Sequence, residues 1–209
     1  MLITKNISFQ YSTKDSLLKF PDITLSDNDN AVILGKSGVG KTTLLHIIAG
    51  LLRPKTGSVF FNDITIEKLS SKEKDQFIGQ NIGMVFQKSY AVKTLNVVEN
   101  LQARLYFAKE KNQKTLTYSL LEQLNLERCA KHKISELSEG QLQRLGIAMA
   151  VVHQPKLILA DEPTSSLDDE NCEAVMQLLL QQAKQNHANL LVITHDQRVK
   201  PLFQNVMAL

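Results

Sequence analysis

The sequence contains little cysteine and no long apolar run. Its 209 residues include Cys129 and Cys172, which are too few for a disulfide framework and are typical of reduced thiols in a cytosolic protein. No apolar run approaches the roughly 20 residues that a membrane-spanning helix needs. Polar residues within residues 1–8 exclude a signal peptide. If the protein works at a membrane, we expect another chain to supply the spanning part.

A concentrated basic block is also absent. Lys and Arg number 24 against 21 Asp and Glu, and the net charge of +3 gives no independent support for a nucleic-acid partner. We find no internal repeat and no low-complexity linker. The length suits one core, or one core with a subdomain.

The clearest motif is a glycine-rich segment that matches G-x-x-x-x-G-K-[ST] at every fixed position. An apolar run at residues 31–34 predicts a buried strand before it, and residues 44–49 predict a helix after it. This context favours a phosphate-binding loop over an unrelated glycine-rich turn. The side chain of Lys41 would reach the β- and γ-phosphates, and the Thr42 hydroxyl would bind Mg²⁺. The loop residues are Gly35, Lys36, Ser37, Gly38, Val39, Gly40, Lys41, Thr42 and Thr43.

Apolar strands alternate with helices along the chain, which predicts an α/β fold with a mostly parallel sheet. The β-rich residues 2–25 predict an antiparallel layer before the phosphate-loop strand. No strand pattern is present from residue 94 to 133, where apolar positions including Phe107 suit amphipathic helices. We therefore expect one domain, 1–209, with a core of residues 1–87 and 154–209 and an inserted helical subdomain at about 88–153.

Polar side chains follow three further apolar strands. Gln87, Asp161 and Glu162, and His195 each stand at or just beyond a strand end, where open α/β sheets bind ligands. Asp161 suits a carboxylate associated with Mg²⁺, and Glu162 could polarise a water for attack on the γ-phosphate. The alternatives are a helix cap or turn for the Asp-Glu pair and a structural role for His195, which is equally well supported. Gln87 alone is a weaker signal.

Ser138 and Tyr11 are two other candidate ligand contacts. Ser138 predicts a helix start, with Gln141 at the capping-box spacing. Gly140 lies in the first turn of that helix, whose N–H groups would form a second anion site. Tyr11, just after the first strand, is either an adenine platform or a half-buried aromatic at a strand end, and spacing alone favours the latter.

In this order the motifs resemble the ATP-binding subunits of ATP-binding-cassette (ABC) transporters over nearly the whole chain. The signature is the most specific part, because other P-loop classes lack it. The matching segments are residues 35–43 (Walker A), Gln87 (Q-loop), residues 137–141 (similar to the signature LSGGQ), residues 157–162 (Walker B with its glutamate), residues 165–168 (D-loop) and His195 (switch histidine).

The resemblance implies a P-loop NTPase core and Mg²⁺-dependent ATP hydrolysis in a head-to-tail dimer. Lys41, Gln87, Glu162 and His195 would be catalytic, and Gln87 would also approach the metal with Thr42 and Asp161. ATP would contact the Walker A residues and, from the other chain, Ser138, Gly140 and Gln141. Tyr11 falls where the family keeps its adenine-stacking aromatic, and the resemblance therefore favours the interpretation of Tyr11 as an adenine platform.

The resemblance also implies partners. We expect a second ATP-binding subunit, with a homodimer favoured over a heterodimer, and a transmembrane permease that holds the chain at the cytoplasmic face of the membrane. The permease groove would lie near residues 88–100, with Tyr90 and Leu95 as contacts. The closest resemblance is to ATPases of lipoprotein release, macrolide efflux and cell division, which favours export. The alternative, an ABC ATPase of DNA repair, translation or cell division, is weakened by the absence of a CxxC pair and a heptad arm, and we expect no nucleic acid.

One departure from the family pattern concerns the signature, where Glu139 replaces the usual first glycine. A carboxylate there would repel a γ-phosphate unless it points away. A helix N-terminus also stabilises an acidic side chain, and this is the favoured interpretation.

Overall fold

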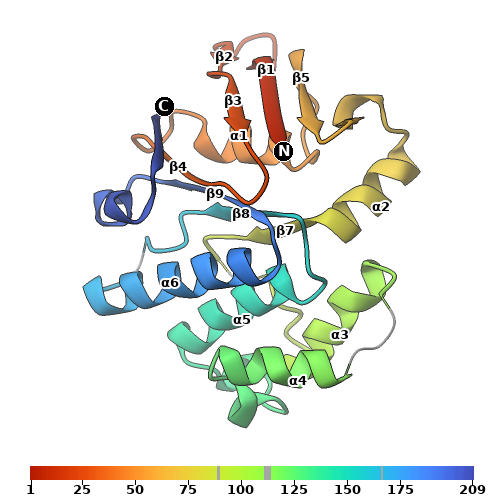
Figure 1. The fold of residues 1–209 in the computed structure, drawn as a ribbon, viewed down its shortest axis with the longest axis vertical. Helices are drawn as coiled ribbons and strands as arrows, with labels where there is room; N and C mark the ends of the chain where they lie inside the picture. Colours follow the sequence, from red (N-terminus) through yellow and green to blue (C-terminus); the bar gives the residue numbers. More distant parts are fainter. Residues whose placement is uncertain (89, 111–113, 166) are drawn as a thin grey trace.

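The computed structural model describes residues 1–88, 90–110, 114–165 and 167–209. Two β-sheets and six α-helices make up this part of the chain (Figure 1). The parallel sheet has the order β10 (Asn205–Ala208), β4 (Asn30–Leu34), β9 (Asn189–Thr194), β8 (Leu157–Asp161) and β7 (Ile82–Val85). The antiparallel sheet has the order β2 (Leu18–Lys19), β1 (Leu2–Phe9), β5 (Thr56–Phe61) and β6 (Ile64–Thr65), and β3 (Ile23–Leu25) also pairs with β1. The predicted α/β class with an antiparallel layer is confirmed.

The helices lie on both faces of the parallel sheet. Figure 1 places α1 between the two sheets, α3, α4, α5 and α6 on the far side of the parallel sheet, and α2 beside its edge. The helices are α1 (Lys41–Ile48), α2 (Ser71–Asn81), α3 (Val97–Phe107), α4 (Lys114–Gln123), α5 (Glu139–Val151) and α6 (Asp169–Gln185), with 3₁₀ turns η1 (Ile66–Lys68), η2 (Glu127–Cys129), η3 (Ile134–Glu136) and η4 (Gln197–Leu202). Among the described residues, no helix is long and apolar enough to cross a membrane.

The strands of the parallel sheet supply two separate cores. Along β4, Ala31 and Ile33 pack toward α1 and the antiparallel sheet, whereas Val32 and Leu34 pack toward the helices on the other face. Strands β8 and β9 alternate in the same way. Successive side chains of a strand point to opposite faces, so a continuous apolar run fills two cores at once. This two-sided burial fixes the sheet and thereby the positions of the strand ends.

Helix α5 packs closely against β7, and Gly83 makes that approach possible. A β-carbon at this position would lie 2.1 Å from the carbonyl oxygen of Ala150, which is too close for any side chain.

The sequence also predicts where several helices begin. Ser70, Asn96 and Ser138 each form the capping box that starts α2, α3 and α5.

Two parts of the prediction were incomplete. Phe107 is 73% exposed and does not join the buried face of α3. It is the last residue of that helix. The short strands β6 and β10 were not predicted. Strand β10 is only half-buried at best along its length, so its sequence lacks the apolar run that identifies the inner strands.

Candidate ATP-binding and hydrolysis site

The phosphate loop lies between β4 and α1, as its sequence context predicts. Gly38 and Gly40 have φ angles of 83° and 100°, a region that glycine occupies without strain. Gly40 is the N-cap of α1 and has no side chain that could satisfy the first N–H groups of the helix. Those donors therefore remain directed into the loop, an arrangement that suits a phosphate group.

The side chain of Lys41 is folded across this loop and is almost completely buried, with 6% exposure. Its Nζ donates to the carbonyl oxygens of Gly35 at 2.8 Å and Lys36 at 3.0 Å. It also lies 3.2 Å from Oε1 of Glu162. One ammonium group thus joins the phosphate loop to the carboxylate that follows β8.

Glu162 receives hydrogen bonds from the end of the neighbouring strand. Its Oε2 accepts from the Thr194 hydroxyl at 2.8 Å and from the backbone N–H of His195 at 3.2 Å, and it lies 2.9 Å from His195 Nδ1. Burial alone would raise the pKa of Glu162, but the hydrogen bonds from His195, Thr194 and Lys41 together lower this pKa below its usual range. The carboxylate is therefore ionised at neutral pH and can accept a proton.

Asp161 is the last residue of β8 and is 8% exposed. Burial raises the pKa of Asp161, and a hydrogen bond from Thr42 opposes that rise. Its Oδ1 is buried with no hydrogen-bond partner among the described residues. A buried, unpaired carboxylate oxygen beside a threonine hydroxyl fits a divalent cation. No group of three or more His, Cys, Asp or Glu that could hold a metal is found in the described ranges.

A pocket of about 310 Å³ brings together most of the predicted residues. Gln87 reaches it from beyond β7, and its Nε2 donates to Ser165 Oγ at 3.2 Å. The pocket is lined by Ser37, Gly38, Gly40, Lys41, Thr42, Thr43, Gln87, Glu162 and His195. The chain thus gathers the strand-end side chains around the phosphate loop, as expected for an α/β sheet.

Tyr11 lies beside the phosphate-loop helix. Its hydroxyl is 2.8 Å from Thr43 Oγ1, and its ring packs edge-on against Phe9 with centroids 4.8 Å apart. The side chain is 65% exposed, so the reading of Tyr11 as a half-buried aromatic is wrong. An exposed ring fixed next to the loop is suited to stacking on a base.

The signature segment stands apart from this pocket. Ser138 caps α5, with its Oγ accepting from the N–H of Gln141 at 3.3 Å, and Gln141 Oε1 accepts from the N–H of Ser138 at 2.8 Å. Ser138 and Glu139 are exposed, and Gly140 is partly exposed. Within the described residues of one chain, none of the signature positions lines the phosphate pocket. Glu139 instead lines a neighbouring pocket of about 280 Å³ together with Gln87 and Lys93.

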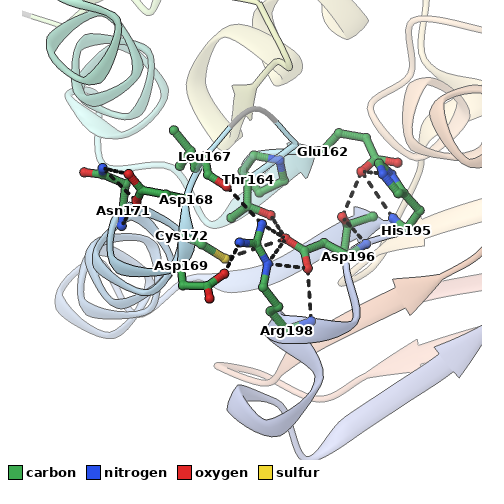
Figure 2. A network of polar contacts seen from close by, with 12 residues as sticks. Glu162, Thr164, Leu167, Asp168, Asp169, Asn171, Cys172, His195, Asp196 and Arg198 are labelled. Atoms are coloured by element: carbon green, nitrogen blue, oxygen red, sulfur yellow. Dashed lines mark hydrogen bonds and ion pairs between the residues drawn. The ribbon is translucent and has the colours of Figure 1, made fainter.

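Sequence reasoning missed three polar residues next to the site: Thr194, Asp196 and Arg198. The Thr194 hydroxyl donates to Glu162 and accepts from the N–H of Asp196 at 3.0 Å. Figure 2 shows Arg198 binding Asp196. The polar sequence at the end of β9 was the available signal. Within the D-loop match, Ser166 lies outside the described residues.

Comparison with known proteins identifies the relatives of this fold. A sequence model described as ABC transporter matches residues 18–165. The lipoprotein-releasing system ATP-binding protein LolD of Legionella pneumophila (strain Lens) is 35% identical over 197 residues, covering 92% of this chain and 86% of that protein. LolD of Buchnera aphidicola subsp. Acyrthosiphon pisum (strain APS) is 34% identical over 202 residues, covering 93% and 89%.

Solved structures agree with this result. The dimeric structure of MJ0796, described as a bacterial ABC transporter cassette, superposes with a TM-score of 0.90 at 32% identity, covering 100% of this chain and 94% of that one. A post-hydrolysis state of MJ0796 bound to ADP and Pi has a TM-score of 0.89, with the same coverage and identity. The family model and these relatives match across the phosphate loop, the strand-end carboxylates and most of the remaining chain. The chain belongs to the ABC transporter family and is an ATP-binding cassette of that family.

Proposed function

We propose that this cassette hydrolyses ATP, with Mg²⁺, to drive a separate transmembrane subunit. The observation that carries the proposal is the 3.2 Å contact between Lys41 of the phosphate loop and Glu162, whose other carboxylate oxygen is held by His195. The Lys41 ammonium, which would bind phosphate, and the Glu162 carboxylate, which can accept a proton, therefore meet at one pocket.

Each residue has a definable role in the reaction. Backbone N–H groups of the loop and the Lys41 ammonium bind the β- and γ-phosphates. Glu162 takes a proton from a water whose oxygen attacks the γ-phosphorus. The bond from that phosphorus to the bridging oxygen breaks, its electron pair leaves with ADP, and the products are ADP and inorganic phosphate. His195 and Gln87 orient the water and the γ-phosphate.

The residues proposed to hold Mg²⁺ are Thr42, Asp161 and Gln87. The unpaired Oδ1 of Asp161 supports this assignment. Bound there, the cation would neutralise negative charge on the β- and γ-phosphate oxygens.

A second chain would complete the site. Most of the Walker A loop and Glu162 line one pocket, whereas Ser138, Gly140 and Gln141 are not among the residues that line it. We infer that the signature helix binds the γ-phosphate held by a partner cassette, and that a homodimer is the favoured assembly. The solved structure of MJ0796 is described as dimeric. ATP would then favour the closed pair, because it contacts both chains only in that state, and hydrolysis would reopen it.

The membrane partner would dock in an apolar groove of about 270 Å³ between β7, α3 and α5. Leu51 and Tyr90 line it and are 50% and 71% exposed, which suits burial against another protein. Tyr90 is one of the two predicted contacts. The other, Leu95, is not among the groove-lining residues, so we do not propose it as a contact. Binding there would hold the chain at the cytoplasmic face of the membrane.

The relatives favour an export or release role. LolD proteins are described as ATP-binding proteins of a lipoprotein-releasing system. They give no support to the alternative of a nucleic-acid machine. We propose that this chain energises a system of the same general type.

The test compares ATP hydrolysis by the wild type and by Glu162→Gln, both measured at a saturating concentration of ATP. Loss of the proton acceptor should lower kcat by about 10²–10⁴-fold. Binding of a fluorescent ATP analogue should persist in both proteins. Equal rates of phosphate release, with the membrane partner present, would overturn the proposal.

A further inference from the structure

Arg198 lies just beyond β9 and joins two segments that flank the hydrolysis site. Its guanidinium binds the Asp196 carboxylate through two nitrogens, Nε at 2.9 Å from Oδ1 and Nη2 at 2.8 Å from Oδ2. The same group donates from Nη1 to Asp169 Oδ1 at 2.6 Å and from Nη2 to the Leu167 carbonyl oxygen at 3.2 Å. Figure 2 shows Arg198 between the turn after β9 and the start of α6.

The Asp196 carboxylate is the centre of this arrangement and is only 10% exposed. Besides Arg198, it accepts a hydrogen bond from the buried Thr164 hydroxyl at 2.8 Å, and Cys172 Sγ donates to it at 3.6 Å. Hydrogen bonds from Arg198 hold the pKa of Asp196 well below its usual range, against the effect of burial. The carboxylate therefore remains an anion that binds both segments at neutral pH.

This cluster is connected to the hydrolysis site through Thr194. The N–H of Asp196 donates to the Thr194 hydroxyl at 3.0 Å, and that hydroxyl donates to Glu162 at 2.8 Å. A continuous path of contacts therefore runs from the Glu162 carboxylate through Thr194 and Asp196 to Arg198 and the start of α6.

We propose that Arg198 is a positioning residue for hydrolysis, which fixes Thr164, Leu167 and Asp169 relative to the turn that carries His195. Arg198 does not line the phosphate pocket, so it acts through Asp196 and Thr194 rather than on the nucleotide. This inference rests on the proposed ATPase function.

The geometry explains why an arginine is suited to the role. Neither segment belongs to a strand or helix interior, so the sheet alone does not fix their separation. A planar guanidinium offers several donors in fixed directions and can hold a carboxylate, a second carboxylate and a carbonyl oxygen simultaneously. Lysine at this position would keep the charge but lose the bidentate contact.

The first test measures ATP hydrolysis by full-length Arg198→Ala and Arg198→Lys, with Arg128→Ala as the control. Arg128 is 94% exposed, and its ion pair with Glu127 is long, at 4.0 Å. We expect Arg198→Ala to lower kcat about tenfold while the KM for ATP stays within about twofold, because small misplacements of catalytic groups reduce the rate without changing binding. Arg198→Lys should fall between the wild type and Arg198→Ala. Wild-type kcat for Arg198→Ala, or a loss confined to KM, would overturn the proposal.

A second test does not depend on catalysis. Amide hydrogen exchange of peptides covering residues 167–172 is compared in the same proteins, without nucleotide and after a check of folding by circular dichroism. Faster exchange in Arg198→Ala but not in Arg128→Ala is expected, and unchanged exchange would overturn the positioning role. If the wild type itself hydrolysed no ATP, the proposed function would fail, while the exchange result would still decide whether Arg198 fixes this segment.

Discussion

Two helix N-termini carry the predicted phosphate contacts, and the chain builds them differently. Helix α1 begins at Gly40, which has no side-chain cap, and Lys41 beside it is buried and contacts Gly35, Lys36 and Glu162. Helix α5 begins at an exposed Ser138 whose capping box is closed within the same helix by Gln141.

This difference suggests how the two ends are used. The α1 site has its cation, carboxylates and amide donors assembled within one chain. The α5 end presents a capped helix to solvent, and Ser138, Gly140 and Gln141 are not among the residues that line the phosphate pocket. In the proposed dimer, the first end supplies binding and chemistry, and the second end detects whether a partner has ATP.

The largest expected effect comes from the α1 end. Lys41→Ala removes the cation that joins the phosphate loop to Glu162, so kcat should fall by about 10³-fold. A colorimetric phosphate-release assay measures this, with Lys156→Ala, an exposed lysine elsewhere, as the control. If Lys41→Ala kept activity within a few-fold of the wild type, the proposed difference between the N-termini of α1 and α5 would be wrong.

The next effect concerns the hydrogen bonds that keep Glu162 ionised. The pKa of Glu162 is lowered, so its carboxylate is ionised at neutral pH and loses its charge as the pH falls through the folded pKa. Thr194→Val removes one donor without changing the side-chain shape and should raise that pKa. The acidic limb of the kcat profile should shift to higher pH by about one unit, and kcat at neutral pH should change less because Glu162 stays ionised there.

An unchanged acidic limb in Thr194→Val would contradict the role of this hydroxyl. Circular dichroism at each pH separates loss of activity from unfolding. The profile is measured from pH 4 to pH 7, roughly the range in which Glu carboxyls and His imidazoles titrate.

A smaller effect is expected at the α5 end. Ser138→Ala removes the cap, which should destabilise the helix start by about 1 kcal/mol. ATP binding to the single chain should be unchanged, whereas ATP-dependent association should weaken. Equilibrium dialysis with labelled ATP and analytical ultracentrifugation measure the two effects separately. Weaker ATP binding by the monomeric variant would show that the signature acts within its own chain.

The smallest effect is expected for Glu139→Gly, which restores the family's usual residue. The Glu139 side chain is exposed and lines the pocket beside Gln87 and Lys93 rather than the phosphate pocket. ATP-dependent association should therefore change by less than about fivefold, the size of an exposed charge interaction. A hundredfold gain would show that the carboxylate opposes the γ-phosphate directly.

The α1 end could be predicted from sequence because its residues are contiguous or follow apolar strands. The loop match identifies Lys41 and Thr42, and strand ends identify Asp161, Glu162 and His195. Parallel strands bring their carboxyl ends to one edge, so these separate segments could be expected to meet.

The remaining features depend on contacts between distant segments. Nothing in the local sequence shows that Arg198 reaches Asp169 at 2.6 Å or that Thr194 donates to Glu162. Strand β10 depends on pairing with β4 rather than on its own apolar pattern. The division into core and helical subdomain at residues 88 and 153 remains a prediction.

The most direct test of the two-ended account is the mass of Glu162→Gln in solution, measured by light scattering with and without Mg²⁺ and ATP. This variant should bind ATP without hydrolysing it, so the joined state accumulates. The account predicts a monomer without nucleotide and a dimer with ATP, and Ser138→Ala introduced into the same variant should weaken that dimer. A protein that binds ATP and remains monomeric at every accessible concentration would contradict the proposal that two identical chains share the nucleotide.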